Sequence, residues 1–120
     1  MRRFLVVDDD EDVLYLLRAI LQNLGQSVQS TSDLEQAKQA LRGGDVDALI
    51  VDVSMPDRTG PDFVAELRLE GIEPPHVYLL SALPPDDVLK MAQDLGVRGI
   101  AKPFTSAKLQ VALSEVLGIV

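Results

Sequence analysis

The chain has 120 residues, a length typical of one domain, and 47% of them are hydrophobic, which excludes a largely disordered chain. It contains no cysteine, so disulfides, thiolate metal sites and thiol nucleophiles are excluded. The net charge of -8 argues against direct nucleic-acid binding, and no apolar run reaches the length of a membrane span or an export signal. We therefore expect a cytoplasmic protein that does not contact a membrane.

The first half of the chain alternates apolar runs with helical periodicity. Residues 4–7 are typical of a buried parallel strand, and five consecutive acidic residues follow at 8–12. The next apolar residues recur with the helical period and predict a helix whose buried stripe is Val13, Leu16, Leu17, Ile20, Leu21 and Leu24. The polar segment 27–31 is expected to be an edge strand. A capping-box pattern at Ser32 and Glu35 then opens a second helix, whose apolar face is Leu34, Ala37 and Leu41.

The second half repeats this alternation three times. Strands are expected at 48–51, 77–80 and 99–101. Helices are expected after Pro61, after residues 84–85 and at the end of the chain. Their apolar faces are Phe63, Val64 and Leu67, then Val88, Met91, Ala92 and Leu95, and last Leu109, Ala112, Leu113, Val116 and Leu117. A glycine stands after each of the five helices, as expected of left-handed C-terminal caps: Gly25, Gly43, Gly71, Gly96 and Gly118.

Five strands that alternate with five helices predict right-handed βαβ units and a parallel sheet. The predicted fold class is α/β, a flavodoxin-like, doubly wound (βα)5 domain whose five-stranded parallel sheet has the order 2-1-3-4-5. No linker, low-complexity segment or internal repeat divides the chain. We therefore expect residues 1–120 to form a single domain, with no output domain.

Chemically active side chains follow the predicted strands. Asp8 and Asp9 follow the first strand, Asp52 the third, Ser81 the fourth and Lys102 the fifth. Because ligands bind beyond the carboxyl ends of parallel strands, these groups are expected to converge if the first and third strands are neighbours. Clustered carboxylates repel one another, and Mg²⁺ with its preference for oxygen ligands relieves that repulsion. The pattern indicates a Mg²⁺ site at which Asp52 acts as a nucleophile and forms an aspartyl phosphate, whose charge Lys102 neutralises.

Four segments of the chain resemble the receiver domain of two-component response regulators. They are FLVVDD at 4–9, LIVD at 49–52 followed by MP at 55–56 and Gly60, SA at 81–82, and KPF at 102–104, which resembles a family segment that contains a cis peptide bond. Each segment alone is a weak signal. Together they stand in the family's order and spacing and cover essentially the whole chain, which makes the resemblance specific.

The resemblance implies a role for each residue of the acidic site. Asp52 would accept a phosphoryl group from the phosphohistidine of a sensor histidine kinase. Asp9, Asp52 and the backbone carbonyl of Ser54 would ligate Mg²⁺ directly, whereas Asp8 would act largely through a water of the metal. The domain would then be a phosphoacceptor with at most slow autodephosphorylation, and not an enzyme.

The same resemblance implies how the domain would signal. Ser81 would move to hydrogen-bond a phosphoryl oxygen, while Lys102 pairs with the phosphoryl charge. The face made by the fourth helix, fifth strand and fifth helix would change and control a downstream effector protein or a fused output domain, or support a phosphorylation-linked homodimer. In the family, the positions of Ser54 and Leu83 tune the lifetime of the phosphoryl group.

One position departs from the family pattern. Receivers usually place an aromatic residue three positions before the lysine, and its ring turns inward as the switch hydroxyl moves. Gly99 stands there in this chain, and the segment 96–102 is about one residue shorter than usual, which makes Ile100 the candidate for a displaced counterpart. Output would then depend on another movement of the same face, or be weak.

Two other functions compete with this interpretation. A pseudo-receiver would keep the fold and dock a partner without being phosphorylated, which the Gly99 departure favours and the complete acidic site opposes. A small aspartyl-phosphate phosphatase of the haloacid dehalogenase type would use Asp8 and Asp10 as its acidic pair. That family normally needs a longer core, and its motif leaves Asp52 unexplained.

Overall fold

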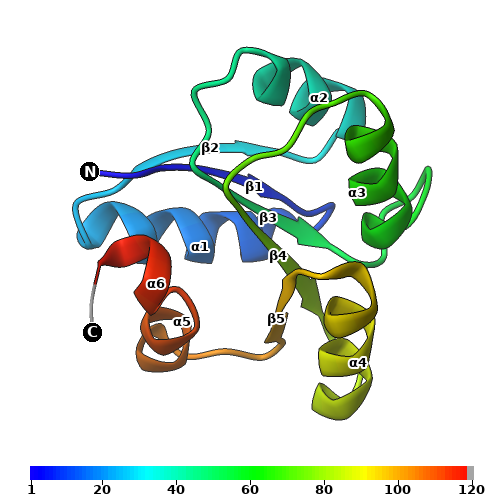
Figure 1. The fold of residues 1–120 in the computed structure, drawn as a ribbon. Coiled ribbons are helices and arrows are strands. Elements are labelled where there is room, and N and C mark those ends of the chain that lie inside the picture. Colours follow the sequence, from blue (N-terminus) through cyan, green and yellow to red (C-terminus); the bar gives the residue numbers. More distant parts are fainter. Residues whose placement is uncertain (119–120) are drawn as a thin grey trace.

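The structure, a computed structural model, describes residues 1–118 and contains a five-stranded parallel sheet with helices on both faces (Figure 1). The strands are β1 (Arg3–Val7), β2 (Ser27–Thr31), β3 (Ala48–Asp52), β4 (His76–Ser81) and β5 (Arg98–Ala101). Their order is β2-β1-β3-β4-β5, and every neighbouring pair is parallel. The predicted fold class and strand order are confirmed, and each strand lies within one residue of its predicted bounds.

The sheet separates two hydrophobic cores. One core lies between the sheet and the helices α2 (Leu34–Arg42), α3 (Gly60–Leu69) and α4 (Pro85–Leu95). The other lies between the sheet and α1 (Glu11–Asn23), α5 (Ser106–Ala112) and α6 (Ser114–Leu117). Because β1 and β3 are covered on both faces, nearly all of their residues are apolar and buried, whereas the edge strand β2 is polar and only half buried.

The buried face of α1 differs from the predicted stripe. Leu14, Leu17 and Leu21 are buried against the sheet, whereas Leu16 is 44% exposed. At 100° per residue, Leu17 and Leu21 point in nearly the same direction and Leu16 points 100° away from Leu17. The sequence showed more apolar residues than one helix face can bury, so the prediction of Leu16 as core was wrong.

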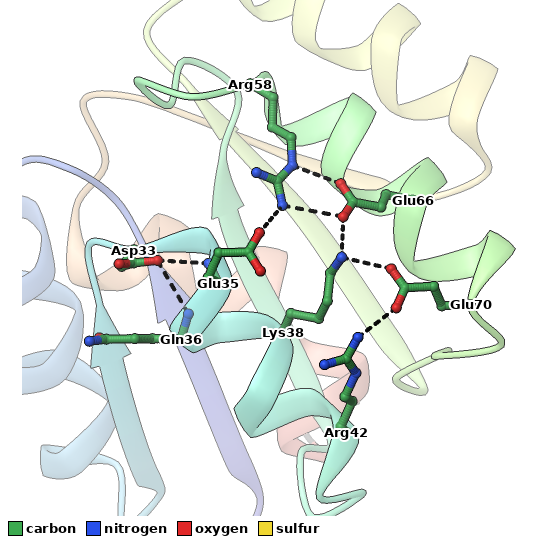
Figure 2. A network of polar contacts seen from close by, with 8 residues as sticks. All are labelled: Asp33, Glu35, Gln36, Lys38, Arg42, Arg58, Glu66 and Glu70. Carbon is green, nitrogen blue, oxygen red and sulfur yellow. Dashed lines mark hydrogen bonds and ion pairs between the residues drawn. The ribbon is translucent and has the colours of Figure 1, made fainter.

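Three helix ends also differ from the prediction. Asp33, and not Ser32, caps α2, because its carboxylate accepts hydrogen bonds from the N–H groups of Glu35 and Gln36 at 2.7 and 3.3 Å (Figure 2). The left-handed residue after α2 is Gly44, whereas Gly43 has a right-handed φ of -65°. The expected fifth helix is interrupted at residue 113 and forms the two short helices α5 and α6.

The two tyrosines lie in opposite surroundings. Tyr78 in β4 is 1% exposed, and no described residue hydrogen-bonds its hydroxyl group. Burial raises the pKa of Tyr78. Tyr15 on α1 is 74% exposed.

Among the described helices, none has the length and apolarity that crossing a membrane requires.

Candidate functional site

Three carboxylates meet at the carboxyl ends of β1 and β3. Asp8 and Asp9 directly follow β1, and Asp52 is the last residue of β3, which pairs with β1. Carboxylate oxygens of the three residues lie within 4.8 Å of one another. Asp8 and Asp52 are buried at 0% and 5% exposure, whereas Asp9 is exposed. The predicted convergence of the three acids is therefore confirmed, with Asp9 on the solvent side.

Lys102 completes this cluster from the end of β5. Its Nζ lies 2.8 Å from Asp8 Oδ2 and 3.5 Å from Asp52 Oδ1. The backbone N–H of Lys102 donates a hydrogen bond to the backbone carbonyl of Ser81 at 2.7 Å, which ties the lysine segment to β4. The Lys102–Pro103 peptide bond is cis, as the resemblance implied. Three carboxylates facing one ammonium group leave the cluster with excess negative charge.

The environment raises the pKa of both Asp52 and Lys102, which disfavours the charged form of the acid and favours the charged form of the base. Burial, reinforced by the charge of Asp8, raises the pKa of Asp52 above the ordinary aspartate value although Lys102 opposes this. Burial alone would lower the pKa of Lys102, but its hydrogen bond with Asp8 and the charge of Asp52 outweigh this, so the pKa of Lys102 is raised. The ammonium group therefore stays protonated, and the carboxylate of Asp52 lacks full charge compensation.

The backbone around Asp52 is tightly held. The backbone N–H of Val53 donates a hydrogen bond to the carbonyl of Leu80 at 2.9 Å. The carbonyl of Val53 in turn accepts a hydrogen bond from the N–H of Gly60 at 2.8 Å. A Cβ atom on Gly60 would lie 2.5 Å from the carbonyl oxygen of Asp52. Only glycine fits such a close approach, so Gly60 lets the start of α3 pack directly against the end of β3.

Ser81 and Ser54 lie near this cluster but are engaged differently. Ser81 is 2% exposed at the end of β4, and its Oγ accepts a hydrogen bond from the N–H of Leu83 at 3.0 Å. Ser54 is exposed two residues after Asp52 and forms an isolated antiparallel bridge with Thr59. The hydroxyl group of Ser81 is thus held in the turn before α4 and makes no hydrogen bond to Asp52 in the described residues.

Asp10 has a role that the sequence analysis missed. Its carboxylate caps α1 by accepting a hydrogen bond from the N–H of Asp12 at 2.9 Å. Its own N–H donates to Asp8 Oδ1, also at 2.9 Å, and so orients the buried carboxylate. The position directly before a helical stripe was the available signal for this cap. Because Asp10 is engaged in capping, it does not join the acidic cluster, contrary to what a phosphatase would require.

Gly99 lies against α4 on a face of the sheet that leaves no room for a side chain. A Cβ atom there would be 2.8 Å from Cγ1 of Val88 and 3.6 Å from Cβ of Ala92. Ile100 is 4% exposed and packs into the opposite core, with α1 and α5. The suggestion that Ile100 replaces the missing aromatic residue was therefore wrong, because consecutive strand residues point to opposite faces.

The donor set of the cluster fits a hard divalent cation. All three acidic groups offer carboxylate oxygens, the ligands that Mg²⁺ prefers, and their excess negative charge is what such an ion would neutralise. The exposed Asp9 leaves the site open to solvent for entry of the ion. The acidic triad can therefore bind a metal at the edge of the sheet where Asp52 lies.

Known proteins share this fold. The response regulator receiver domain family matches residues 4–114. The chain is 26% identical to the chemotaxis protein CheY4 of Vibrio cholerae, with a TM-score of 0.85 over 97% of this chain and 98% of that chain. It is also 28% identical to the signal receiver domain of an HD domain-containing protein from Pseudomonas fluorescens, with a TM-score of 0.83 over 98% of this chain and 87% of that chain.

Two longer regulatory proteins are similar over nearly the whole of this chain. The response regulator SaeR of Staphylococcus aureus is 27% identical over 118 residues, which are 98% of this chain and 51% of SaeR. The sensory/regulatory protein RpfC of Xanthomonas campestris is 33% identical over 117 residues, which are 94% of this chain and 16% of RpfC. The chain thus spans about half of one relative and a smaller part of the other. The family match across nearly all of its length shows that this chain belongs to the response regulator receiver domain family of two-component signalling.

Proposed function

We propose that Asp52 is the phosphoacceptor of this receiver and takes its phosphoryl group from the phosphohistidine of a sensor histidine kinase. The observation that carries the proposal is the position of the Asp52 carboxylate, which lies at the end of β3 within 4.8 Å of Asp8 and Asp9 oxygens and 3.5 Å from Lys102 Nζ. A nucleophilic carboxylate, further acidic oxygens for a cation and an ammonium group are the parts that phosphoryl transfer to aspartate needs.

The transfer forms one bond and breaks one. A carboxylate oxygen of Asp52 attacks phosphorus, the bond between phosphorus and the histidine nitrogen breaks, and its electron pair stays on the imidazole. Lys102, which contacts Asp8 and Asp52 before the transfer, then also pairs with the phosphoryl group. Ser81 releases the N–H of Leu83 and turns its hydroxyl group to a phosphoryl oxygen, a movement that reshapes the turn before α4.

Asp9, Asp52 and the Ser54 carbonyl would hold Mg²⁺ directly, and Asp8 would act through water. When bound, Mg²⁺ supplies charge neutralisation between the carboxylates and the incoming phosphoryl group. Asp8 is held ready by the N–H of Asp10 and by Lys102. The domain is its own substrate, so we propose a single modification with at most slow autodephosphorylation and no turnover of an external substrate.

Signal output would use the face formed by α4, β5 and α5. The turn after Ser81 leads directly into α4, which packs against Gly99 of β5. A movement of α4 over β5 would then carry the signal without an aromatic switch residue. A downstream effector protein, a fused output domain or a second phosphorylated copy would recognise the altered face, and residues 1–120 would act as one unit in that contact.

Intact-mass measurement tests this function directly. The protein and its Asp52→Asn variant are incubated with acetyl phosphate, with and without Mg²⁺. We expect one labile phosphoryl group that requires both Mg²⁺ and Asp52. An adduct on Asp52→Asn would contradict the assignment of the acceptor. Absence of any adduct would favour a pseudo-receiver, whereas repeated release of inorganic phosphate would favour the phosphatase.

A further inference from the structure

Charged side chains form a continuous network between α2 and α3 (Figure 2). Acidic and basic groups alternate along it, in the order Glu35, Arg58, Glu66, Lys38, Glu70 and Arg42. We call these six residues the α2–α3 charge network. Lys38 is the most buried of them at 6% exposure and binds both Glu66 and Glu70. One end of the network is Arg42, whose sole ion pair with the residues of 1–118 is to Glu70 at 2.7 Å.

Arg58 differs from the other members because it precedes α3, whereas the others lie in α2, in α3 or, for Glu70, at the C-cap of α3. It belongs to residues 53–59, which we call the acceptor loop, since they join Asp52 at the end of β3 to α3. Its Nε donates to Glu66 on α3 at 2.7 Å, and its Nη2 donates to Glu35 in the first turn of α2 at 2.8 Å. Its guanidinium group also lies 5.5 Å from the ring centre of Phe63. One side chain thus ties the acceptor loop to two helices.

The geometry points to Arg58 as a positioning residue for the one proposed metal ligand of the acceptor loop, the backbone carbonyl of Ser54. The inference rests on the proposed function, because it takes the Ser54 carbonyl as a ligand of Mg²⁺. Arg58 precedes Thr59, which bridges to Ser54 across the loop. When the contacts of Arg58 hold it in place, the neighbouring bridge between Thr59 and Ser54 is held as well. The loop is then ordered before a cation binds. Preordered ligands bind more tightly because binding need not order the loop.

The planar fork of arginine suits this role. A guanidinium group can donate to two carboxylates in fixed directions while its stem and plane pack on an aromatic ring, whereas a lysine ammonium group is a single point charge. Glu66 is itself held by Lys38, so Arg58 is anchored to a partner that is already immobile. The partly buried position of Arg58, with a side chain 23% exposed, protects these contacts from solvent.

Two matched variants separate positioning from simple electrostatics. Arg58→Met and Arg42→Met remove the same charge from the same network, but only Arg58 touches the acceptor loop. Loss of a positive charge by itself would strengthen cation binding in both variants. Positioning predicts the opposite for Arg58→Met, namely weaker binding of Mg²⁺. We expect its Kd to rise by roughly threefold to tenfold, which corresponds to the free energy of one partly buried ion pair. Arg42→Met is expected to keep a wild-type or slightly lower Kd.

The measurements are an amide NMR titration with Mg²⁺ and hydrogen exchange of residues 53–59 in the metal-free proteins. We expect faster exchange in the acceptor loop of Arg58→Met and unchanged exchange there in Arg42→Met. Arg58→Lys, which keeps the charge and loses the fork, is expected to recover only part of the Mg²⁺ affinity. Thermal unfolding of both Met variants shows whether they are equally folded.

The outcomes distinguish this inference from the proposed function. If Arg58→Met binds Mg²⁺ as tightly as Arg42→Met, with unchanged loop exchange, Arg58 does not position the site and the inference is overturned. If the wild-type protein binds Mg²⁺ but takes no phosphoryl group at Asp52, the proposed function fails while the Kd comparison still decides the role of Arg58. Absence of Mg²⁺ binding by the wild-type protein overturns both.

Discussion

At the scale of single residues, Gly99 shows how α4 approaches the sheet. Cγ1 of Val88 occupies the place where a Cβ atom of residue 99 would stand, 2.8 Å away. Val88 is itself buried, so it cannot move aside into solvent. The close contact between α4 and β5 therefore takes the place of the aromatic side chain that receivers usually carry here, and any larger residue would force Val88 or the backbone to shift.

Substitution of this glycine tests the packing. We expect Gly99→Ala to lower the free energy of unfolding by about 1 to 3 kcal/mol, because overpacking a tight contact forces backbone or side-chain shifts. Denaturant unfolding measures the loss. The double variant Gly99→Ala with Val88→Ala should be less destabilised than the sum of the two single variants. Additive losses would show that the two positions do not share one contact.

Asp52 gives a prediction for the dependence of stability on pH. Burial and the charge of Asp8 raise its pKa in the folded protein above the unfolded value of about 3.9. Its contribution to stability is therefore fully present below that value and is lost as the pH rises through the folded pKa. Without Mg²⁺, Asp52→Asn should be more stable than the wild-type protein at pH 7, and the difference should shrink towards pH 4. Chemical unfolding across this range measures it, and a less stable Asp52→Asn protein at pH 7 would contradict it.

At the scale of the elements, Lys38 joins α2 to α3. Its hydrogen bonds lower the pKa of Glu66 and of Glu70 below the ordinary glutamate value. Carboxylates with lowered pKa stabilise the fold above their unfolded pKa of about 4.3, and this contribution is lost as the pH falls through the folded pKa. Lys38→Met would leave the two carboxylates facing each other without their shared partner.

We therefore expect Lys38→Met to lower Tm by several degrees at pH 7, and by less as the pH falls through the range in which Glu66 and Glu70 take up protons. The control is Lys90→Met, which removes an exposed lysine from α4. Calorimetry at several pH values measures both variants. Equal losses in the two proteins, or a loss that does not depend on pH, would show that the ion pairs of Lys38 contribute nothing beyond net charge.

Four of the strands were predictable from sequence because each contains a short apolar run, and the polar β2 was predicted as an edge strand. Helix faces and helix ends were harder to predict, because neighbouring residues of similar chemistry compete for the same capping or buried position. Ser32 and Asp33 both have capping side chains, and only the start of α2 at Leu34 selects Asp33. Leu14 and Leu16 are equally apolar, and the docking angle of α1 decides that Leu14 is buried.

The acidic site was predictable because its members each follow a strand, so the sheet topology alone brings them together. Ser81 and Lys102 also lie where the strand ends placed them. The α2–α3 charge network could not be derived in this way. Arg58, Lys38 and Glu66 carry no spacing signal across three separate elements, and their contacts depend on how two helices pack side by side.

At the scale of the whole molecule, cation binding and folding are linked. The carboxylates of Asp8, Asp9 and Asp52 are brought together only when β1 and β3 pair, so a cation that binds them favours the folded state. At a Mg²⁺ concentration of about 100 times its Kd, the gain in stability is about 2.7 kcal/mol.

Thermal unfolding with increasing Mg²⁺ tests this linkage. We expect Tm of the wild-type protein to rise, and the rise to be largely lost in Asp9→Asn, which removes the carboxylate at the exposed side of the cluster. Asp94→Asn removes one exposed acid of α4 that does not belong to the acidic triad, and should retain the full rise. An equal response of all three proteins would mean that Mg²⁺ acts only on the general charge of -8.

The contrast between the two tyrosines gives this tryptophan-free protein two optical reporters. Acrylamide or iodide in solution can collide with the ring of Tyr15 but cannot reach that of Tyr78. Emission that resists quenching therefore reports on β4, the strand that ends in Ser81. A change in that protected emission on phosphorylation would follow the signal inside the sheet, in unlabelled protein and in real time.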